Sequence, residues 1–372
     1  MSLLGDNRLK LGVFAANLDG GLTATTAPER HRLNWPTVTK VARLADKAGF
    51  ELQVPLARWR GLGGITNFNG CNYEPLTWAA GVASVTEHSN VFATIHVPVI
   101  HPIVAAKQMT TVDHIANGRF GFNLVCGWFP AEFAMFGAPM MDHTKRYEYA
   151  AEWLEIVRRL WTAQEEFDYE GMFFRIEKGV SQPKPIRMPM PPVMNAGQSP
   201  TGAHFAARYA DIAFLSIAES EPLDVVRAKF ASLRRLAHEQ YHRQIEIWTS
   251  CWVICRPTEA EARRFRDYCI LEHGDAGAVD GLPPEVLPPK DTPPEILEQF
   301  RIKARAGFGG LHVVGTPDQV ADRMKDIAAL GADGIVLSWV NYEEGITTWS
   351  REVMPRLEAS GLRRPFTLNA SL

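Results

Sequence analysis

Residues 117–128, which read NGRFGFNLVCGW, indicate the fold class most directly. An Asn-Gly pair predicts a turn, residues 119–125 predict a short apolar strand, and a glycine and a tryptophan follow where the strand ends. Asn123 interrupts the apolar run. A buried amide without partners costs roughly 1–3 kcal/mol. Asn123 therefore either bonds to neighbouring backbone or faces a site at the carboxyl end of the strand.

The segments on both sides alternate between strand and helix. The strand segments are continuous apolar runs, as expected for a parallel sheet covered by helices on the outside. Strands are predicted at residues 9–15, 50–55, 91–97, 119–125, 191–196, 212–215, 245–254 and 334–339. Helices are predicted at residues 37–48, 75–86, 102–115, 144–162, 223–241, 259–271, 317–330 and 347–357, with another from residue 200. Eight strand–helix steps predict a (β/α)₈ barrel with its site at the carboxyl ends of the strands.

Two segments depart from this alternation. Residues 167–176 centre on a Glu-Gly pair and predict a hairpin outside the barrel. Residues 272–309 hold six prolines from position 283 to position 294. This composition predicts an insertion of low intrinsic order, either a lid or a surface excursion. We expect one barrel domain over residues 1–372, with loops 16–32, 56–71 and 272–309 shaping the substrate pocket.

Composition excludes several classes of protein. A net charge of −3 argues against a general nucleic-acid or anionic-membrane binder, and no apolar run reaches the length of a membrane helix. Five scattered cysteines predict reduced thiols, as in a cytoplasmic protein. Zinc, P-loop and EF-hand spacings are missing from the sequence, so no metal site is expected.

Four motifs together resemble one known family. They are NGRFGFNLVCGW, then DHTKRY at residues 142–147, YEGMFF at 169–174 and NAGQS at 195–199. In this order they resemble the flavin-dependent, bacterial-luciferase-like monooxygenases over essentially the whole chain. The chain looks most similar to the branch of the pyrimidine (uracil) oxygenases, with the sulfone monooxygenases close by. The resemblance implies reduced FMN (FMNH2) at the carboxyl end of the barrel, and O2 activated there as a flavin peroxide.

The resemblance also implies individual site residues. The O2 pocket would be lined by Thr94 and Asn123. Flavin contacts would fall at Ala57, Arg58, Asn123, Glu132, Arg146, Tyr147 and Ser199. The sequence departs from the branch pattern at positions 57 and 58, where a larger aliphatic and a Lys are expected, and at Cys126, where a Thr or Ser is usual. These departures concern the substrate end of the pocket.

Each of these residues also has a structural interpretation. Arg146 begins a long helix, where a cation is unfavourable, so it pairs either with a phosphate or with Asp142 or Glu148 at the surface. Tyr147 could be core, and Ser199 is at least a helix cap. Glu132 could be a solvated loop charge. Trp59, Trp128 and Trp339 would either line a flat ligand or pack in the core, and His96 and His101 are more simply structural.

The predicted function is an FMNH2-dependent monooxygenase acting on a small heterocyclic amide such as a pyrimidine, a sulfone or a halogenated aromatic. No Gly-x-Gly-x-x-Gly motif joins a strand to a helix, so a separate NAD(P)H:flavin reductase is expected to supply the FMNH2. Two alternatives share the barrel: an F420-dependent dehydrogenase and a non-catalytic flavin-binding subunit. We expect a cytoplasmic homodimer or homotetramer, by the habit of the family.

Overall fold

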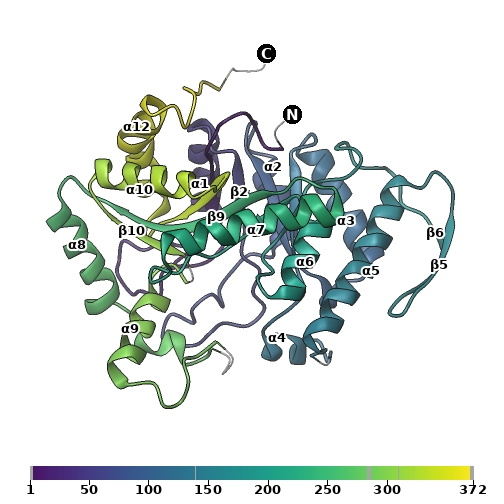
Figure 1. Ribbon diagram of the computed structural model, residues 1–372, viewed down its shortest axis with the longest axis horizontal. Coiled ribbons are helices and arrows are strands. Elements are labelled where there is room, and N and C mark those ends of the chain that lie inside the picture. Colours follow the sequence, from purple (N-terminus) through teal and green to yellow (C-terminus); the bar gives the residue numbers. More distant parts are fainter. Residues whose placement is uncertain (1–2, 139, 283–285, 309, 369–372) are drawn as a thin grey trace.

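A closed barrel of eight parallel strands forms the centre of the molecule (Figure 1). The computed structural model describes residues 3–138, 140–282, 286–308 and 310–368. The barrel order is β1-β2-β3-β4-β7-β8-β9-β11, and β11 pairs again with β1. The strands are β1 (Lys10–Phe14), β2 (Leu52–Val54), β3 (Asn90–His96), β4 (Phe120–Val125), β7 (Val193–Asn195), β8 (Ile212–Phe214), β9 (Glu246–Cys255) and β11 (Gly334–Ser338). The eight strands expected from the sequence are thus all present, and the predicted fold is confirmed.

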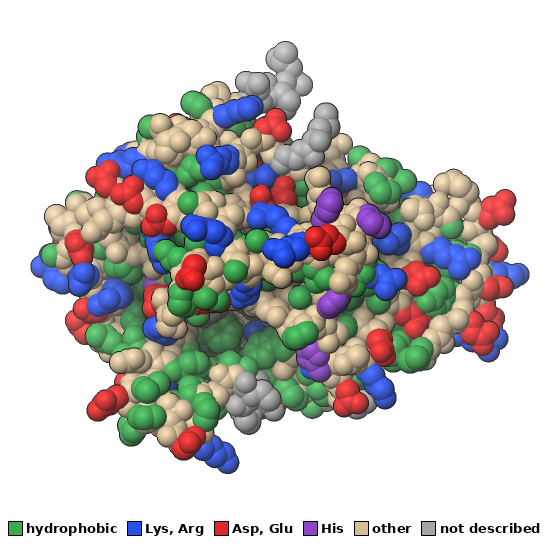
Figure 2. Space-filling model, viewed as in Figure 1, with side chains coloured by type: hydrophobic (Ala, Val, Ile, Leu, Met, Phe, Trp, Pro, Cys, Tyr) green, Lys and Arg blue, Asp and Glu red, His purple; other side chains and the backbone are tan. Residues whose placement is uncertain are grey.

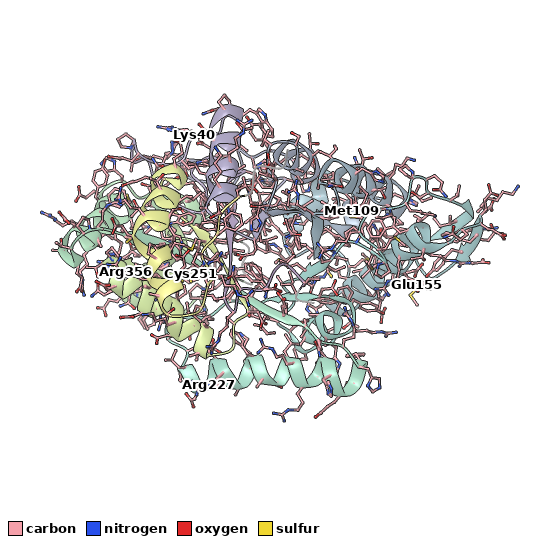
Figure 3. The ribbon with its side chains drawn as sticks, turned by 90° about the horizontal axis from the view of Figure 1, so that it is seen from above. Lys40, Met109, Glu155, Arg227, Cys251 and Arg356 are labelled. Atoms are coloured by element: carbon pink, nitrogen blue, oxygen red, sulfur yellow. The ribbon has the colours of Figure 1, made fainter. Side chains whose placement is uncertain are left out.

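Helices surround the barrel. Seen from above in Figure 3, Lys40, Met109, Glu155, Arg227 and Arg356 mark five of these helices around the rim, and Cys251 of β9 lies inside the ring. The helices after the first six barrel strands are α1 (Trp35–Lys47), α2 (Pro75–Ala83), α3 (Pro102–Ile115), α5 (His143–Thr162), α6 (Pro200–Tyr209) and α7 (Leu223–Tyr241). The later ones are α8 (Glu259–Asp267), α10 (Pro317–Ala329), α11 (Tyr342–Thr348) and α12 (Met354–Ala359). The predicted helix at 347–357 is corrected to α11, a π-helical turn at Trp349–Val353 and α12.

Two large aromatic side chains fill the barrel, and glycines make room for them. Phe92 and Trp248 belong to the interior cluster of fully buried side chains. A Cβ at Gly121 would lie 2.2 Å from the Phe92 ring, and one at Gly334 would lie 2.3 Å from the Trp248 ring. Side chains alternate between the two faces of a strand. Thr94, two positions after Phe92 in β3, therefore faces the same barrel interior as Phe92.

One strand of the described chain, β10, is not predicted from the sequence. Strand β10 (Leu311–Gly315) pairs in parallel with the outer half of β9, from Cys251 to Cys255. The inner half of β9 pairs with β8 and β11. Because β9 is ten residues long, it extends past the barrel and offers β10 an edge. Strand β10 therefore follows the insertion at residues 272–309 and joins the end of that segment to β9.

The segment expected to have low order contains regular structure. Within residues 272–309, helix α9 (Pro294–Arg305) and a 3-10 turn (Ala276–Val279) are present; residues 283–285 and 309 lie outside the described residues. Asp275 ties this segment to the loop after β2, because its Oδ2 accepts hydrogen bonds from the backbone N–H and the hydroxyl of Thr66 at 2.7 and 2.6 Å. The hairpin predicted at 167–176 is formed by β5 (Phe167–Glu170) and β6 (Arg175–Gly179) and projects from the side of the barrel (Figure 1).

Candidate active site

Thr94 and Asn123 face each other at the carboxyl ends of neighbouring strands. They are register partners in β3 and β4, and Asn123 Nδ2 lies 3.4 Å from Thr94 Oγ1. The Thr94 hydroxyl donates to the carbonyl of Pro55 at 2.6 Å, which fixes its direction. Asn123 Oδ1 is buried and has no hydrogen-bond partner among the described residues. The amide is therefore not satisfied by neighbouring backbone, and it offers a buried acceptor to a ligand.

A second group joins the loop after β2 to helix α4 (Pro130–Met135), a short helix in a segment expected to be loop. Glu132 Oε1 accepts the backbone N–H of Trp59 at 2.7 Å and lies 3.5 Å from Arg58 Nη1. Glu132 Oε2 lies 3.7 Å from Nδ1 of His96. The Arg58 and Glu132 side chains are each only 3% exposed. Glu132 is thus a buried ion-pair partner, and its interpretation as a solvated loop charge is wrong.

His96 remains neutral in this group. It lies two residues after Thr94 and therefore on the same face of β3. Burial, with a further contribution from the Arg58 charge, lowers the pKa of His96 to about 3. Burial also lowers the pKa of Arg58, and the nearby Glu132 carboxylate opposes that shift.

Arg146 turns inward from the first turn of α5. Its Nη1 donates a hydrogen bond to the carbonyl of Gly127, just after β4, and its Nε is buried without a partner in the described chain. No ion pair joins it to Asp142 or Glu148 within the described ranges, so the surface interpretation is wrong. Cys126 lies nearby, and burial raises the pKa of its thiol to about 12. The thiol stays protonated and acts as a small, weakly polar wall.

Tyr147 and Ser199 meet at the turn between β7 and α6. A Cβ at Gly197 or Gly202 would lie 2.8 or 2.6 Å from the Tyr147 hydroxyl, so these glycines admit the phenol to the turn. Ser199 Oγ accepts the N–H of Gly202 at 3.1 Å, as the N-cap of α6, and lies 3.2 Å from His143 Nε2. Burial raises the pKa of Tyr147, so its hydroxyl remains a donor. A hydroxyl, a phenol and a helix amino end together suit an anion.

Asn195 joins the two halves of the site. Its Nδ2 donates to the carbonyl of Leu124 at 2.8 Å, beside Asn123, and its Oδ1 accepts the N–H of Gly197 at 2.9 Å. The end of β4 is thereby held against the turn that carries Ser199. Ala57 is buried between Pro55 and Arg58 on the other side. The structure thus brings the predicted residues to one end of the barrel.

A cavity of about 680 Å³ opens at this end, between helix α9 and the loop after β8. Figure 2 shows it as a hollow with hydrophobic side chains on the lower part of the molecule. Lys229 lies at its edge and donates to Gln198 Oε1 at 3.0 Å. The lining residues are Gln198, Ser216, Ile217, Ala218, Glu219, Ser220, Glu221, Lys229, Leu282, Val286, Phe300, Lys303, Ala304, Phe308, Gly310 and His312.

The other aromatic and histidine candidates divide into residues of the site and residues with a structural role. Trp128 belongs to the site, where it stacks on the Arg58 guanidinium with 4.8 Å between its ring centroid and Cζ. Trp339 is core, because it packs edge-on against Trp349 and Tyr342 in the helical layer. His101 caps α3 by accepting the N–H of Ile103.

Three residues of the site, His96, His143 and Lys229, are not among those predicted from the sequence. Only His96 carried a usable signal in the sequence, its position two residues after Thr94. His143 and Lys229 lie on helices, and the sequence did not predict which side of each helix faces the site.

Comparisons with known proteins find relatives over nearly the whole chain. The model of the luciferase-like monooxygenase family matches residues 9–334. An FMNH2-dependent dimethylsulfone monooxygenase of Pseudomonas putida is 28% identical over 356 residues, with 93% of this chain and 94% of the relative covered. A pyrimidine monooxygenase of Acinetobacter baylyi is 31% identical over 360 residues, with 93% and 94% covered. The crystal structure of DmoA from Hyphomicrobium sulfonivorans shares the fold, with a TM-score of 0.83 at 19% identity over 95% of this chain and 89% of that one.

A parallel barrel with buried polar side chains and a capped helix amino end at the carboxyl ends of its strands defines a class of (β/α)₈ enzymes. Within that class, the chain belongs to the luciferase-like monooxygenase family. The family predicted from the four motifs is confirmed, together with its neighbourhood of sulfone and pyrimidine monooxygenases.

Proposed function

We propose that this chain is an FMNH2-dependent monooxygenase that uses O2 to oxygenate or cleave a small organic substrate. The candidates are a heterocyclic amide such as a pyrimidine, a sulfone and a halogenated aromatic. The observation that carries the proposal is the Thr94–Asn123 pair, whose buried acceptor Oδ1 lacks a partner in the described chain. A barrel that served only as a scaffold would have no reason to keep this costly amide.

The residues present fit a bound flavin mononucleotide. Arg146, Tyr147 and Ser199 supply a guanidinium, a phenol and a hydroxyl at a helix amino end, a set suited to the phosphate. Asn123 and the backbone around Ala57 and Arg58 would lie against the ring. Glu132 holds that backbone in place through the N–H of Trp59.

Bound FMNH2 would supply the electrons that activate O2. The chain itself would position the flavin and O2, and it would exclude water from them. Pro55 holds the Thr94 hydroxyl in one direction, and Asn123 keeps one acceptor for the ligand. Trp128 and the buried Cys126 add weakly polar walls near this pocket, and exclusion of water strengthens each polar contact inside it.

We also propose that a separate NAD(P)H:flavin reductase supplies the FMNH2 in the cytoplasm. This follows from the relative that is named for FMNH2, the reduced flavin. A homodimer or homotetramer is supported by the exposed apolar side chains Ile103, Val104 and Ile115 on α3. Among the described residues, no helix is long and apolar enough to cross a membrane.

An anaerobic titration with FMNH2, followed by mixing with oxygenated buffer, tests this function. We expect saturable binding of FMNH2 and a transient change in flavin absorbance when oxygen arrives. Binding of F420 in place of FMNH2, without oxygen consumption, would move the protein to the dehydrogenases. Binding of FMNH2 without any reaction with oxygen would make it a flavin-binding subunit.

The oxygen pocket itself is tested by Asn123→Ala. Loss of the amide should lower product formation by at least about 100-fold, the scale at which a single positioned polar group acts in catalysis. The fold should survive, because the change removes a carbonyl oxygen that is unsatisfied within the described chain and only one long hydrogen bond, from Nδ2 to Thr94 Oγ1 at 3.4 Å. Gln164→Ala, which removes an exposed amide after α5, serves as the control. Full activity in Asn123→Ala would refute the assignment.

A further inference from the structure

Asn195 connects two parts of the candidate active site through its side chain. It is the last residue of strand β7 and is only 3% exposed. Its Nδ2 donates to the carbonyl of Leu124 at 2.8 Å, and its Oδ1 accepts the N–H of Gly197 at 2.9 Å. The backbone pairing of β4 with β7 ends at this same position, where Leu124 is the register partner of Asn195. The amide therefore continues the connection where the strand ladder stops.

The turn on one side of Asn195 has little freedom to move independently. An Asn oxygen that accepts the N–H two residues later forms a compact turn. A Cβ at Gly197 would lie 2.8 Å from Asn195 Oδ1 and 2.8 Å from the Cα of Gly202, in the first turn of α6. Because these three residues are in such close contact, a shift of the amide also shifts the start of α6.

The two connected parts carry different candidate groups. Leu124 directly follows Asn123, whose Oδ1 has no hydrogen-bond partner among the described residues. On the other side, Ser199 caps α6, and the Tyr147 hydroxyl lies beside the turn. Both ends of the Asn195 amide are already bonded to backbone. Its own contribution is therefore to the spacing of the two parts.

The flavin proposed above has two ends that match these parts. Its ring would lie against Asn123, and its phosphate would lie at Ser199, with a flexible ribityl chain between them. When two linked groups bind at once, the second binds at a high effective concentration, provided that the spacing of the two subsites fits the linker. Rigid spacing also avoids the entropy cost of ordering the protein during binding. The affinity for the whole molecule therefore depends on what holds the two subsites in place.

We propose that Asn195 is a positioning residue, which sets the spacing between the phosphate subsite at Ser199 and the ring subsite at Asn123. This inference rests on the proposed function and adds to it a residue that acts through its neighbours. It also gives a role to the first residue of the motif NAGQS, of which the proposed function uses only Ser199. Arg146 provides a second connection, from α5 to the carbonyl of Gly127. Loss of Asn195 should therefore loosen the spacing without separating the two subsites.

The test compares the whole flavin with its two halves under anaerobic conditions. FMNH2 and reduced riboflavin are titrated into the protein by calorimetry, and inorganic phosphate is titrated as a competitor of FMNH2. Asn195→Ser keeps an oxygen that can accept the N–H of Gly197 and loses the amide N–H that bonds to Leu124, whereas Asn195→Ala removes both bonds. Asn90→Ala is the matched control, because it removes an amide that also makes two hydrogen bonds, at the amino end of β3.

We expect both Asn195 variants to bind FMNH2 at least about tenfold more weakly than wild type, because the advantage of linkage commonly exceeds this factor. Their affinities for reduced riboflavin and for inorganic phosphate should stay within about threefold of wild type, since each half needs only one intact subsite. Asn90→Ala should bind all three ligands as wild type does. A purely structural role of Asn195 would instead weaken all three ligands alike.

The proposal is overturned if both Asn195 variants bind FMNH2 as wild type does, or if the affinity for riboflavin or phosphate falls as far as that for FMNH2. It is also overturned if inorganic phosphate does not compete with FMNH2 in the wild type, because no separate phosphate subsite then exists. Circular dichroism shows whether each variant is folded, and Asn195→Ser carries the test alone if Asn195→Ala unfolds. A wild-type protein that never binds FMNH2 would instead refute the proposed function, which is a separate outcome.

Discussion

His96 makes the folding stability depend on pH. In the folded protein its pKa is lowered to about 3, chiefly by burial, against 6.5 when it is exposed. Between these two values the unfolded chain binds the proton and the folded chain does not. Stability therefore falls as the pH drops from about 6.5 toward 3, by up to about 1.4 kcal/mol per pH unit.

His96→Asn should remove this contribution. Urea unfolding at a series of pH values from 7 to 4 should show a shallower loss of stability in His96→Asn than in wild type. His204→Asn, at an exposed position on α6, is the matched control and should keep the wild-type slope. Equal slopes in all three proteins would mean that His96 takes up its proton in the folded state.

At the residue scale, the sequence predicted positions better than contacts. Thr94 and Asn123 could be paired because they end neighbouring strands, and the structure places their side chains 3.4 Å apart. The contact between Glu132 and Arg58 joins residues 74 positions apart and depends on how two loops fold over the barrel mouth. A sequence without an alignment holds no pattern for such a contact.

At the element scale, the fit of aromatic rings against glycines sets the barrel interior. A Cβ at Gly121 would lie 2.2 Å from the Phe92 ring, and both residues are in the barrel wall. Gly121→Ala should therefore destabilise the protein by about 1–3 kcal/mol, as overpacking of a core does. Urea unfolding at constant pH measures the change.

A second substitution tests the cause. Phe92→Leu shortens the ring that the new methyl group would meet, so the double variant should be more stable than the sum of the two single effects predicts. Gly137→Ala serves as a control for the glycine substitution itself, because no atom lies within 4 Å of its added Cβ, although its positive φ adds some strain. Strict additivity of Gly121→Ala and Phe92→Leu would contradict the packing argument.

The elements that escaped prediction share a physical cause. Strand β10 is short, its residues alternate between buried and partly buried, and it pairs with the extended edge of β9. Helix α9 follows a proline-rich run, and the composition of that run predicted low order instead of a helix. The hydrogen bonds of Asp275 to Thr66 hold the segment that contains α9 near the cavity. Both interpretations of residues 272–309, a lid and a surface excursion, stay predictions.

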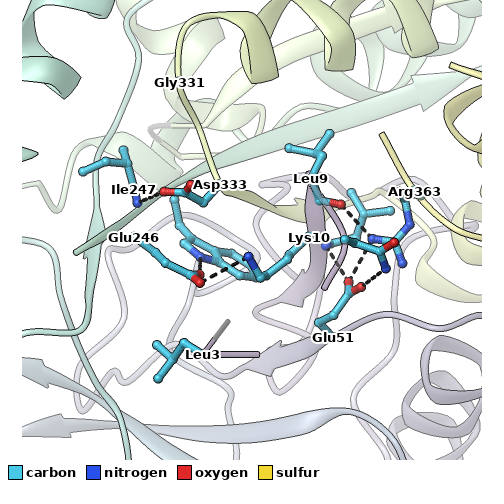
Figure 4. A network of polar contacts seen from close by, with 12 residues as sticks. Leu3, Leu9, Lys10, Glu51, Glu246, Ile247, Gly331, Asp333 and Arg363 are labelled. Atoms are coloured by element: carbon cyan, nitrogen blue, oxygen red, sulfur yellow. Dashed lines mark hydrogen bonds and ion pairs between the residues drawn. The ribbon is translucent and has the colours of Figure 1, made fainter. Parts of the chain in front are cut away.

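At the scale of the whole molecule, the carboxyl end of the barrel holds the candidate active site, and the amino end contributes to stability. The site occupies the carboxyl ends of the strands, whereas polar networks close the amino ends (Figure 4). There Lys10 Nζ lies 3.2 Å from Glu246, inside the base of the barrel. The first and last described segments of the chain lie at this end in Figure 1, opposite α4 and α9. Substitutions at the amino end should thus change stability without changing chemistry.

Arg363 offers the sharpest case, because it ties the end of the chain to its first strand. Its Nη1 lies 2.9 Å from Glu51 and donates to the carbonyl of Leu9, and both charged side chains are almost fully buried (Figure 4). Arg363→Met would leave the buried Glu51 carboxylate without its positively charged partner. We therefore expect the free energy of unfolding to fall by about 3–5 kcal/mol. Urea unfolding measures that loss, and activity per folded molecule should stay at the wild-type level.

The matched control for Arg363→Met is Arg364→Met, at the exposed neighbouring position, which should change stability by less than about 0.5 kcal/mol. Arg363→Met combined with Glu51→Gln should recover part of the loss, since the stranded charge is then gone. A loss confined to activity, with unchanged unfolding, would contradict the division of tasks between the two ends of the barrel. Such a result would mean that the amino end communicates with the site through the strands.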